Sequence, residues 1–513
     1  MRSRIIREYR LRSLSDELSH ELGHKLRRMK KMSRLGLLSL EADEIEARAL
    51  LNQHPDVHYY EEDKELFLQA EDVDGNYPSK QESALWLKDV LGLSAVNPSE
   101  SIPVASGEVA VAVIDSGTSY DHPFLSSAIS INRAEVPSNG VDDDGNGYID
   151  DYYGADAKAK NGNVGETATD HGSHVAGIVK IIRDQAIVDH SEAAKVSILP
   201  IRFIDSSGVG STSTAIEAIE YAVARGAKVI NASWGAPGDA SFSQALYDAV
   251  VDLYNRDILF VAAAGNASAG KVFGSDNDQI PFFPSSFNIP GSLNVASVTP
   301  TYDSGSNLQS KDISHFSNYG KKSVYLSAPG AYADETGSQA GVWSVNGLFD
   351  SGDKEVSNLY KRKKGTSMAA PVVSAVAAVV RAINPSLTAY EVRSLLLNSA
   401  SLADDSLEAD KTITGKILNA QAAFAAAGTT VSSGARPAVD STNRVLGFSS
   451  RETQESAGPS AGGLPGGGCG ALHLEGLSKA PSPWQGNSLG LFCLLYFLFL
   501  SIKKILFYNK ERA

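Results

Sequence analysis

The middle of this chain carries a series of short apolar runs separated by helical patterns. Continuous apolar runs rich in β-branched residues are typical of strands that a parallel sheet buries on both faces. Between two of these runs, Thr214–Arg225 has apolar residues at helical spacing, with Ser213 as the expected N-cap and Gly226 as the stop. We therefore predict an α/β fold with a mostly parallel central sheet and helices on both faces. The runs are Val109–Ile114, Val196–Ile201, Lys228–Ile230, Ile258–Ala262, Leu293–Val298 and Val324–Leu326.

Composition limits the classes of partner. The chain has 513 residues, of which 42% are hydrophobic and 21% charged, an ordinary balance for a globular protein. A formal net charge of -14 argues against nucleic acid as a partner and is compatible with bound cations. Only Cys469 and Cys493 occur, both near the C-terminus, so we expect no disulfide and no thiolate metal site in the body.

The chain divides into five segments by composition. Residues 1–34 are basic and polar, and no apolar stretch of the kind found in secretory signals follows them. Residues 35–74 read as a small α/β unit, and residues 75–430 hold the strand–helix alternation. Residues 431–488 are rich in Gly, Ser and Pro and read as a flexible linker. Residues 489–513 contain an apolar run and a basic end.

Polar residues follow the predicted strands where a parallel sheet collects reactive groups, at the carboxyl ends. Asp115 comes directly after one strand and Asn266 almost directly after another. His171 and Ser367 each stand at the opening of an apolar helix, and Pro371 is tolerable there only in the first turn. A serine nucleophile, an imidazole base, a carboxylate that orients it and an amide for the oxyanion are what acyl transfer needs.

Each of these residues also has an ordinary interpretation when taken alone. An aspartate after a strand is usually a turn residue, a histidine among small residues usually packs, and a serine after Gly-Thr often caps a helix. His171 and His174 also have the spacing of a helical metal pair. No glutamate completes a zinc-protease motif, so we expect His174 to be structural.

The three blocks around these residues resemble those of the subtilisin-like serine proteases (subtilases). They are Asp115-Ser-Gly, His171-Gly-Ser-His-Val-Ala-Gly and Gly365-Thr-Ser-Met-Ala-Ala-Pro-Val, in that family's order, and the resemblance covers roughly residues 75–425. It implies a three-layer subtilisin-like fold and a serine endopeptidase. In that reading Asp115 orients the base His171, Ser367 is the nucleophile and Asn266 stabilises the oxyanion. The segments Gly208-Val209-Gly210 and Ser233-Trp234-Gly235 would bind substrate, with Trp234 hinting at an apolar preference.

An acidic loop predicts a calcium site. Its spacing offers oxygen ligands from side chains and one backbone carbonyl, with Gly147 at the turn, although Tyr153 stands where such loops carry a bidentate glutamate. A solvated acidic turn is the alternative. Comparable loops in subtilases hold structural calcium, and we expect a stabilising role here. The expected ligands are Asp142, Asp144, Asn146, Tyr148 and Asp150.

The two ends imply processing. Residues 35–74 resemble the inhibitor-type propeptide of subtilases, which assists folding, blocks the active site and is removed by self-cleavage, here near Leu68–Asp74. A small unrelated module is the alternative. The C-terminal segment resembles a bacterial sorting signal or a tail anchor, with Cys469 as a candidate for processing or lipid attachment. We therefore expect a secreted or surface enzyme facing outward on a membrane, with a true start upstream of Met1 that would supply the missing signal peptide.

Two rival functions remain. A catalytically dead scaffold that binds surfaces would carry the same fold, but intact Asp115, His171, Asn266 and Ser367 argue against it. A calcium-dependent adhesion or structural protein would depend on the acidic loop instead of Ser367. Protein or peptide substrates and the chain's own propeptide are the partners that the protease interpretation implies.

Overall fold

The computed structural model describes most of the chain between residues 3 and 446. The described residues are 3–8, 18–20, 22, 26–32, 35–42, 49–52, 54, 57–72, 90–93, 102–166, 169–268, 270–302, 308–333, 339–352, 356–402 and 410–446. The expectations for the C-terminal tail, including Cys469, lie outside these residues.

A largely parallel sheet organises the body, as the sequence predicts. Within the described residues it has ten strands in the order β22-β23-β17-β15-β13-β11-β7-β9-β8, with β16 paired to β15. All neighbouring pairs are parallel except β15–β16 and β22–β23. The strands are β7 (Val109–Asp115), β8 (Ala155–Asp156), β9 (Val196–Arg202), β11 (Val229–Ala232), β13 (Leu259–Ala263), β15 (Ser292–Tyr302), β16 (Leu308–Ile313), β17 (Leu326–Pro329), β22 (Ser401–Leu402) and β23 (Lys416–Ile417).

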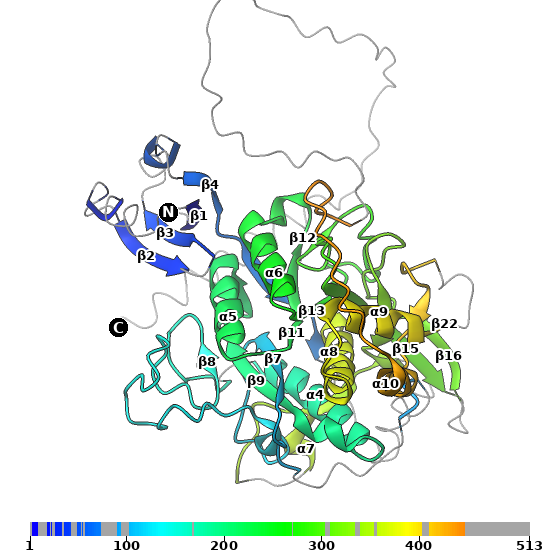
Figure 1. The fold of residues 1–513 in the computed structure, drawn as a ribbon. Helices are drawn as coiled ribbons and strands as arrows, with labels where there is room; N and C mark the ends of the chain where they lie inside the picture. The colour runs from blue at the N-terminus through cyan, green and yellow to red at the C-terminus, as the bar shows by residue number, and fades with distance from the viewer. Residues whose placement is uncertain are drawn as a thin grey trace, which may run out of the picture. The chain divides into compact units, whose positions relative to one another are not determined.

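Helices cover both faces of this sheet and complete three layers. Alternate residues of β7 show the division: Val109, Val111 and Val113 pack with one group of helices, and the residues between them pack with the other. Figure 1 shows α5 and α6 on one side of β7, β11 and β13, and α4 and α8 on the other. The predicted fold class is confirmed. The helices are α4 (His171–Ile187), α5 (Thr212–Ala224), α6 (Gln244–Asn255), α8 (Thr366–Ile383), α9 (Ala389–Ser399) and α10 (Ala420–Thr429).

One helix in the described part of the chain is long and apolar enough to cross a membrane by length and composition. It is α8, and 94% of its apolar window is buried inside the protein. It packs against α4 and the central strands, so its composition reflects a place in the core.

The N-terminal residues form a separate small sheet. Its strand order is β2-β3-β1-β4, from β1 (Ser3–Glu8), β2 (Leu26–Met32), β3 (Leu37–Ala42) and β4 (Val57–Glu62). The sequence analysis separated residues 1–34 from this unit because of their charge. That boundary is wrong, since β1 is the strand that pairs with both β3 and β4.

Acidic residues at the end of β4 and just after it contact helix N-termini of the body. Asp63 accepts hydrogen bonds from the Ser213 backbone N–H at 2.8 Å and from its hydroxyl at 2.6 Å. Glu61 accepts from the Gln244 N–H at 2.9 Å, at the start of α6. The contacted helix α5 begins one residue before Ser213, at Thr212, and its N-cap is Ser211, which forms a capping box. The prediction of Ser213 as the N-cap is wrong.

The body also extends past residue 430, where the sequence analysis placed the start of a linker. Asn384 donates to the Thr430 carbonyl at 2.8 Å, and Leu446 N donates to Ser286 O at 2.9 Å. Burial alone would raise the pKa of the Glu391 carboxyl, but hydrogen bonds from the Thr388 N–H and then from Ser432 and Ser433 hold it well below its usual range. Residues 431–446 are thus held against the body.

Candidate active site

Three adjacent strands bring the predicted residues together at their carboxyl ends. Asp115 is the last residue of β7, Ser233 directly follows β11, and Asn266 lies just beyond β13. In the sheet β11 lies between β7 and β13. Because the three strands are parallel, the same edge carries all three residues.

Asp115 and His171 form a buried pair. Asp115 Oδ1 lies 2.7 Å from His171 Nδ1, and the two side chains are 0% and 4% exposed. The Ser116 backbone N–H also donates to Oδ1 at 2.8 Å. His171 Nε2 is buried and has no hydrogen-bond partner among the described residues, so it is free to accept a proton.

Ser367 is the second residue of α8, which begins at Thr366, so it stands at the opening of this helix as the sequence predicts. Its hydroxyl donates to the Ser233 carbonyl oxygen at 2.9 Å. Pro371 lies in the second turn, not the first, and its missing N–H leaves the Ser367 carbonyl without a helical partner. The Ser233 hydroxyl replaces that partner at 3.0 Å. The start of the helix is thereby tied to the end of β11.

A peptide carbonyl of the chain itself occupies the position where an oxyanion would form. Gln69 O accepts from Asn266 Nδ2 at 2.7 Å and from the Ser367 backbone N–H at 3.2 Å. The Asn266 amide is oriented for this, because its Oδ1 accepts from both the Thr366 N–H and hydroxyl at 3.0 Å. Two donors therefore converge on one backbone oxygen.

Gly365 allows this close approach. Its φ is 154°, and a Cβ there would lie 2.4 Å from Gln69 O and 2.9 Å from Ala70 Cα. Both of those atoms belong to backbone, which a side chain cannot displace cheaply. The glycine before Thr366 therefore keeps space for a peptide to lie across the start of α8.

The two predicted substrate-binding segments flank the residues that precede Gln69. Strand β5 (Glu65–Leu68) pairs antiparallel with β10 (Val209–Ser211) on one side and with β12 (Trp234–Pro237) on the other. The registered pairs are Gly210–Leu66, Val209–Phe67, Trp234–Leu68 and Gly235–Phe67. Gly208 lies at the turn before β10, with φ +78°. An extended segment is thus bound by strand addition on both edges.

The Trp234 side chain has a different place from the one expected. It is fully buried, its indole N–H donates to Ile114 O at 2.8 Å, and its ring meets Phe203 edge-on at 4.9 Å. This apolar cluster also contains Leu66, which is 2% exposed. The apolar surface therefore surrounds Leu66, the fourth residue before the Gln69–Ala70 bond, and does not surround Gln69.

His174 is structural, as expected. Burial lowers the pKa of its ring to about 3, and the nearby Lys363 ammonium acts in the same direction. Its Nε2 lies 3.0 Å from Val342 O and 3.2 Å from Lys361 O, which fixes it as a donor. A neutral ring bound to two carbonyls leaves the zinc interpretation without support.

Glu166 is a neighbour of the Asp115–His171 pair that the sequence did not reveal. It accepts from the Ser116 hydroxyl at 2.6 Å and from the Gly172 N–H at 2.9 Å. Burial raises the pKa of its carboxyl to about 8, with the charge on Asp115 adding to the effect and the Ser116 bond opposing it. No spacing in the sequence links it to the site, because the loop that carries it belongs to no motif.

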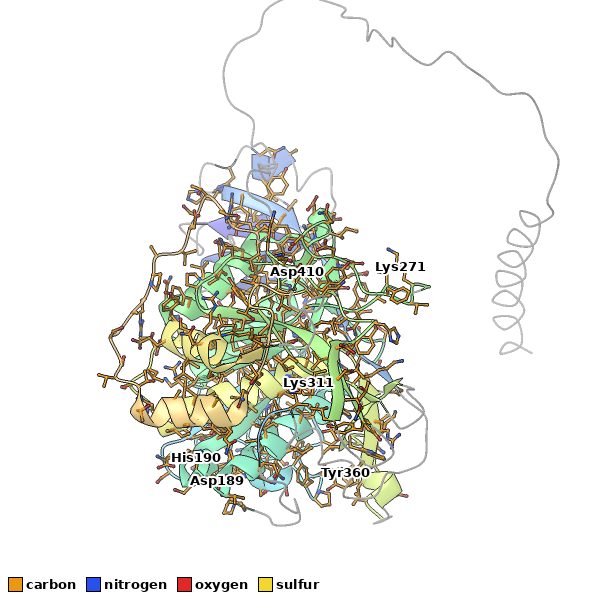
Figure 2. The ribbon with its side chains drawn as sticks, turned by 90° about the vertical axis from the view of Figure 1, so that its right-hand side faces the viewer. Asp189, His190, Lys271, Lys311, Tyr360 and Asp410 are labelled. Atoms are coloured by element: carbon orange, nitrogen blue, oxygen red, sulfur yellow. The ribbon has the colours of Figure 1, made fainter. Side chains whose placement is uncertain are left out.

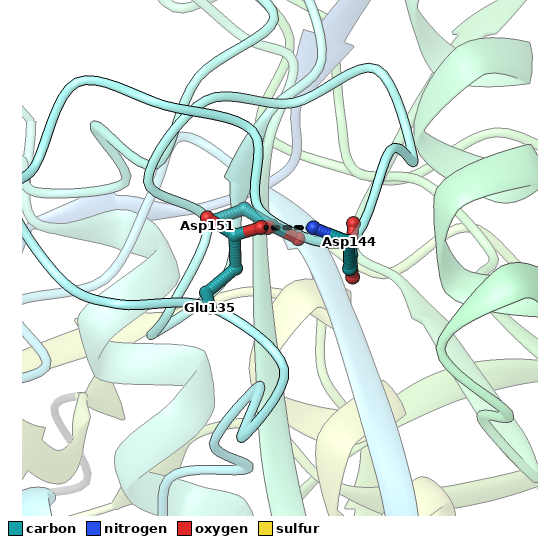
Figure 3. Close-up of side chains that lie close together, drawn as sticks. All are labelled: Glu135, Asp144 and Asp151. Atoms are coloured by element: carbon teal, nitrogen blue, oxygen red, sulfur yellow. Dashed lines mark hydrogen bonds between the residues drawn. The ribbon is translucent and has the colours of Figure 1, made fainter.

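The acidic loop brings together a partly different set of carboxylates from the one expected. Glu135, Asp144 and Asp151 each offer an oxygen within 4.8 Å of the others, and Figure 3 shows them facing a common point. Of the predicted ligands only Asp144 belongs to this group. Asp142 and Asp150 accept backbone N–H groups of the loop instead, and the Asn146 amide donates to Asp144 and Asp151. The Tyr148 ring packs against Tyr221.

This cluster fits a hard cation. Glu135 is 4% exposed and its Oε2 has no hydrogen-bond partner among the described residues. The amides of Asn132 and Asn146 point their nitrogens at Asp144 and Asp151, and turning each amide over would present oxygen instead. Oxygen donors of this kind are what calcium prefers.

Curated proteins with similar sequences are proteases. Subtilisin-like protease 1 of Plasmodium falciparum is 30% identical over 296 residues, covering 56% of this chain and 39% of that protein. Halolysin of Haloferax mediterranei is 30% identical over 321 residues, covering 61% of this chain and 49% of that protein. The chain thus spans less than half the length of these relatives.

Solved structures share the fold. Fervidolysin from Fervidobacterium pennivorans matches 83% of this chain and 61% of its own with a TM-score of 0.56 and 19% identity. The epidermin leader peptide processing serine protease EpiP from Staphylococcus aureus matches 84% and 99% with a TM-score of 0.55 and 18% identity. The profile of the subtilase family matches residues 106–436, which include every residue of the candidate site after Gln69 and Ala70. The chain belongs to the subtilase family.

Proposed function

We propose that this protein is a serine endopeptidase in which Asp115, His171 and Ser367 form the triad. The observation that carries the proposal is the Gln69 carbonyl oxygen bound by Asn266 and by the Ser367 N–H. A site built to hold a peptide carbonyl beside a serine hydroxyl at a helix start is suited to acyl transfer. Membership of the subtilase family supports the same activity.

The reaction follows from these positions. Rotation of the Ser367 side chain away from Ser233 O brings its hydroxyl to the Gln69 carbonyl carbon, and His171 Nε2 takes the proton. Asp115 stabilises the resulting imidazolium, and Asn266 with the Ser367 N–H stabilises the oxyanion. The bond to Ala70 then breaks as the leaving nitrogen receives the proton from His171. Water, deprotonated by His171, then attacks the acyl carbon, and His171 returns that proton to the Ser367 oxygen as the bond to the Gln69 carbonyl carbon breaks and the carboxylate is released.

The chain's own N-terminal unit is the first substrate in this proposal. Strand β5 is bound as substrate would be, and the small sheet before it contacts the body through Asp63 and Glu61. Tyr59 adds a bond to Asp248 at 3.1 Å on α6. We infer that cleavage falls between Gln69 and Ala70, and that the released unit stays bound as an inhibitor until it is degraded.

Mass spectrometry of the expressed chain tests both statements. The expected product begins at Ala70, and Ser367→Ala should remain joined to its first 69 residues. Ser399→Ala, at the end of α9 with its hydroxyl bonded to the Leu395 carbonyl of the same helix at 2.8 Å, is the matched control and should process normally. An unprocessed chain that a serine-directed fluorophosphonate does not label would point to a dead scaffold. Cleavage at the same bond in Ser367→Ala would show that another protease makes the cut.

We also propose that Glu135, Asp144 and Asp151 hold a structural calcium ion. The buried, unpartnered oxygen of Glu135 and the two adjacent amides support it. Calcium should raise the melting temperature of the chain, and a chelator should lower it. Glu135→Gln should lose this response, whereas Asp239→Asn, on a surface turn elsewhere, should keep it. An unchanged calcium response in Glu135→Gln would refute the assignment. If Glu135→Gln lost adhesion but kept proteolysis, the rival adhesive function would be favoured.

The apolar run and basic residues within 489–513 support a proposal for the place of action. We propose a surface enzyme, anchored or sorted by residues 489–513, that acts on proteins outside the membrane. Mass spectrometry of the C-terminus of the protein isolated from its native cells would report retention, cleavage or lipidation at Cys469.

A further inference from the structure

The residues that follow the Gln69–Ala70 bond are also bound by strand addition. Strand β6 (Glu71–Asp72) pairs antiparallel with β21 (Tyr360–Lys364), which in turn pairs with β20 (Val342–Val345). The register sets Asp72 opposite Lys363. Tyr360, labelled in Figure 2, marks the start of β21. Asp72 is thus the third residue after the bond, and its position is fixed by backbone pairing.

Two lysines of β21 converge on the Asp72 carboxylate. Lys361 Nζ lies 2.7 Å from Asp72 Oδ2, and Lys363 Nζ is ion-paired with Asp72 Oδ1. The Lys363 side chain is 6% exposed, whereas Lys361 is 36% exposed. The Asp72 side chain is 52% exposed, so water screens the pair in part, and the buried Lys363 ammonium makes it a charge-assisted recognition contact of moderate strength.

Among the described residues of the body, one carboxylate faces the same two lysines. Asp170 lies 2.6 Å from Lys363 Nζ and 3.3 Å from Lys361 Nζ, and its side chain is 4% exposed. With Asp72 bound, two ammonium groups face two carboxylates. Cleavage leaves Asp72 as the third residue of the new N-terminus, which begins at Ala70. When this terminus moves out of the subsite, the two ammonium groups face Asp170 alone among the described residues. The empty subsite therefore has an excess positive charge, part of which is buried, and an acidic residue removes that excess.

We propose that Lys361 and Lys363 make this enzyme selective for an acidic residue at the third position after the cleaved bond of its protein substrates. The inference rests on the proposed endopeptidase activity and names a substrate class for the same site. Its support is the charge balance around Asp72 and the register of β6 on β21. A neutral residue at that position would leave Lys361 and Lys363 together with one positive charge more than Asp170 balances, and a lysine there would add repulsion.

Internally quenched peptides with the chain's residues 65–74 test this selectivity on the processed full-length protein. One peptide keeps Asp72, and two others carry Asp72→Asn or Asp72→Lys. A peptide with Glu65→Gln is the control, because it has the same net charge as the Asn peptide and changes an exposed residue outside the lysine pair. Fluorophosphonate labelling measures the concentration of active sites in each preparation.

The Asn peptide should show roughly tenfold lower kcat/KM than the Asp peptide, as loss of a charge-assisted contact implies. The Lys peptide should be worse, the Glu65→Gln peptide should match the parent, and added salt should narrow the differences. In Lys361→Gln the Asp preference should shrink severalfold. Arg362→Gln, whose guanidinium lies over the Trp343 ring at 5.0 Å, should retain it.

The outcomes separate the two proposals. Enzyme that labels with the fluorophosphonate and cleaves the Asp and Asn peptides equally overturns the selectivity alone. A preference that persists unchanged in both Lys361→Gln and Lys363→Gln places its cause elsewhere and also overturns it. Absence of labelling and of cleavage of every peptide overturns the endopeptidase activity on which the inference rests.

Discussion

Replacement of Asn266 by leucine tests the oxyanion assignment most directly. Asn266 Nδ2 makes the shorter of the two contacts to Gln69 O, at 2.7 Å compared with 3.2 Å for the Ser367 N–H. Leucine has a similar volume and no donor. Loss of one such donor costs about 3–4 kcal/mol in the transition state, or roughly 10²–10³ in kcat. KM should change little, because strand pairing along β10 and β12 is untouched.

Leucine also removes the Oδ1 atom that accepts from Thr366, so the start of α8 needs a separate check. Thr366→Val removes the hydroxyl part of that anchor and leaves the Asn266 donor in place. Processing of the full chain and hydrolysis of a peptide spanning residues 65–74, normalised to fluorophosphonate labelling, report both variants. We expect Thr366→Val to lose less than about tenfold. An Asn266→Leu variant within tenfold of wild-type kcat would refute the view that this amide stabilises the transition state.

Three further predictions concern the surroundings of the site. Gly365→Ala should block processing, because its Cβ would lie 2.4 Å from Gln69 O, and gel analysis showing normal cleavage would contradict this. Glu166 has a folded-state pKa of about 8 against an ordinary 4.5, so the folded protein binds that proton more tightly. The free energy of unfolding should therefore fall as pH rises from 4.5 through 8, and Glu166→Gln should lack this fall in denaturant titrations at several pH values between 4.5 and 8. Parallel curves for the two proteins would rule this prediction out. Asp63→Ala removes two bonds to Ser213 and should release the cleaved N-terminal unit roughly tenfold faster in a dissociation assay, with an unchanged rate as the contrary result.

Local patterns in the sequence were enough to predict the sheet and the helices that carry the reactive groups. The apolar runs correspond to β7, β9, β11, β13, β15 and β17, with ends shifted by a few residues, and α4 and α8 begin at His171 and Thr366. These features depend on residues that are close together along the chain, so the periodicity of apolar residues is enough to predict them. The many charged residues of the first segment do not indicate a strand by periodicity, so its structure was not predicted. In the structure, β1 lies between β3 and β4 and pairs with both.

The sequence by itself thus determined the parallel α/β body, the places of His171 and Ser367 at helix openings, and the position of Asp115 at a strand end. Only the tertiary structure decided which peptide bond lies at Ser367, which carboxylates join Asp144, and which lysines meet Asp72. Each of these contacts joins residues far apart in the chain, such as Gln69 with Asn266 or Asp72 with Lys363. No local pattern records such a pairing, because it depends on strand register and on how the loops at the sheet edge are folded against one another.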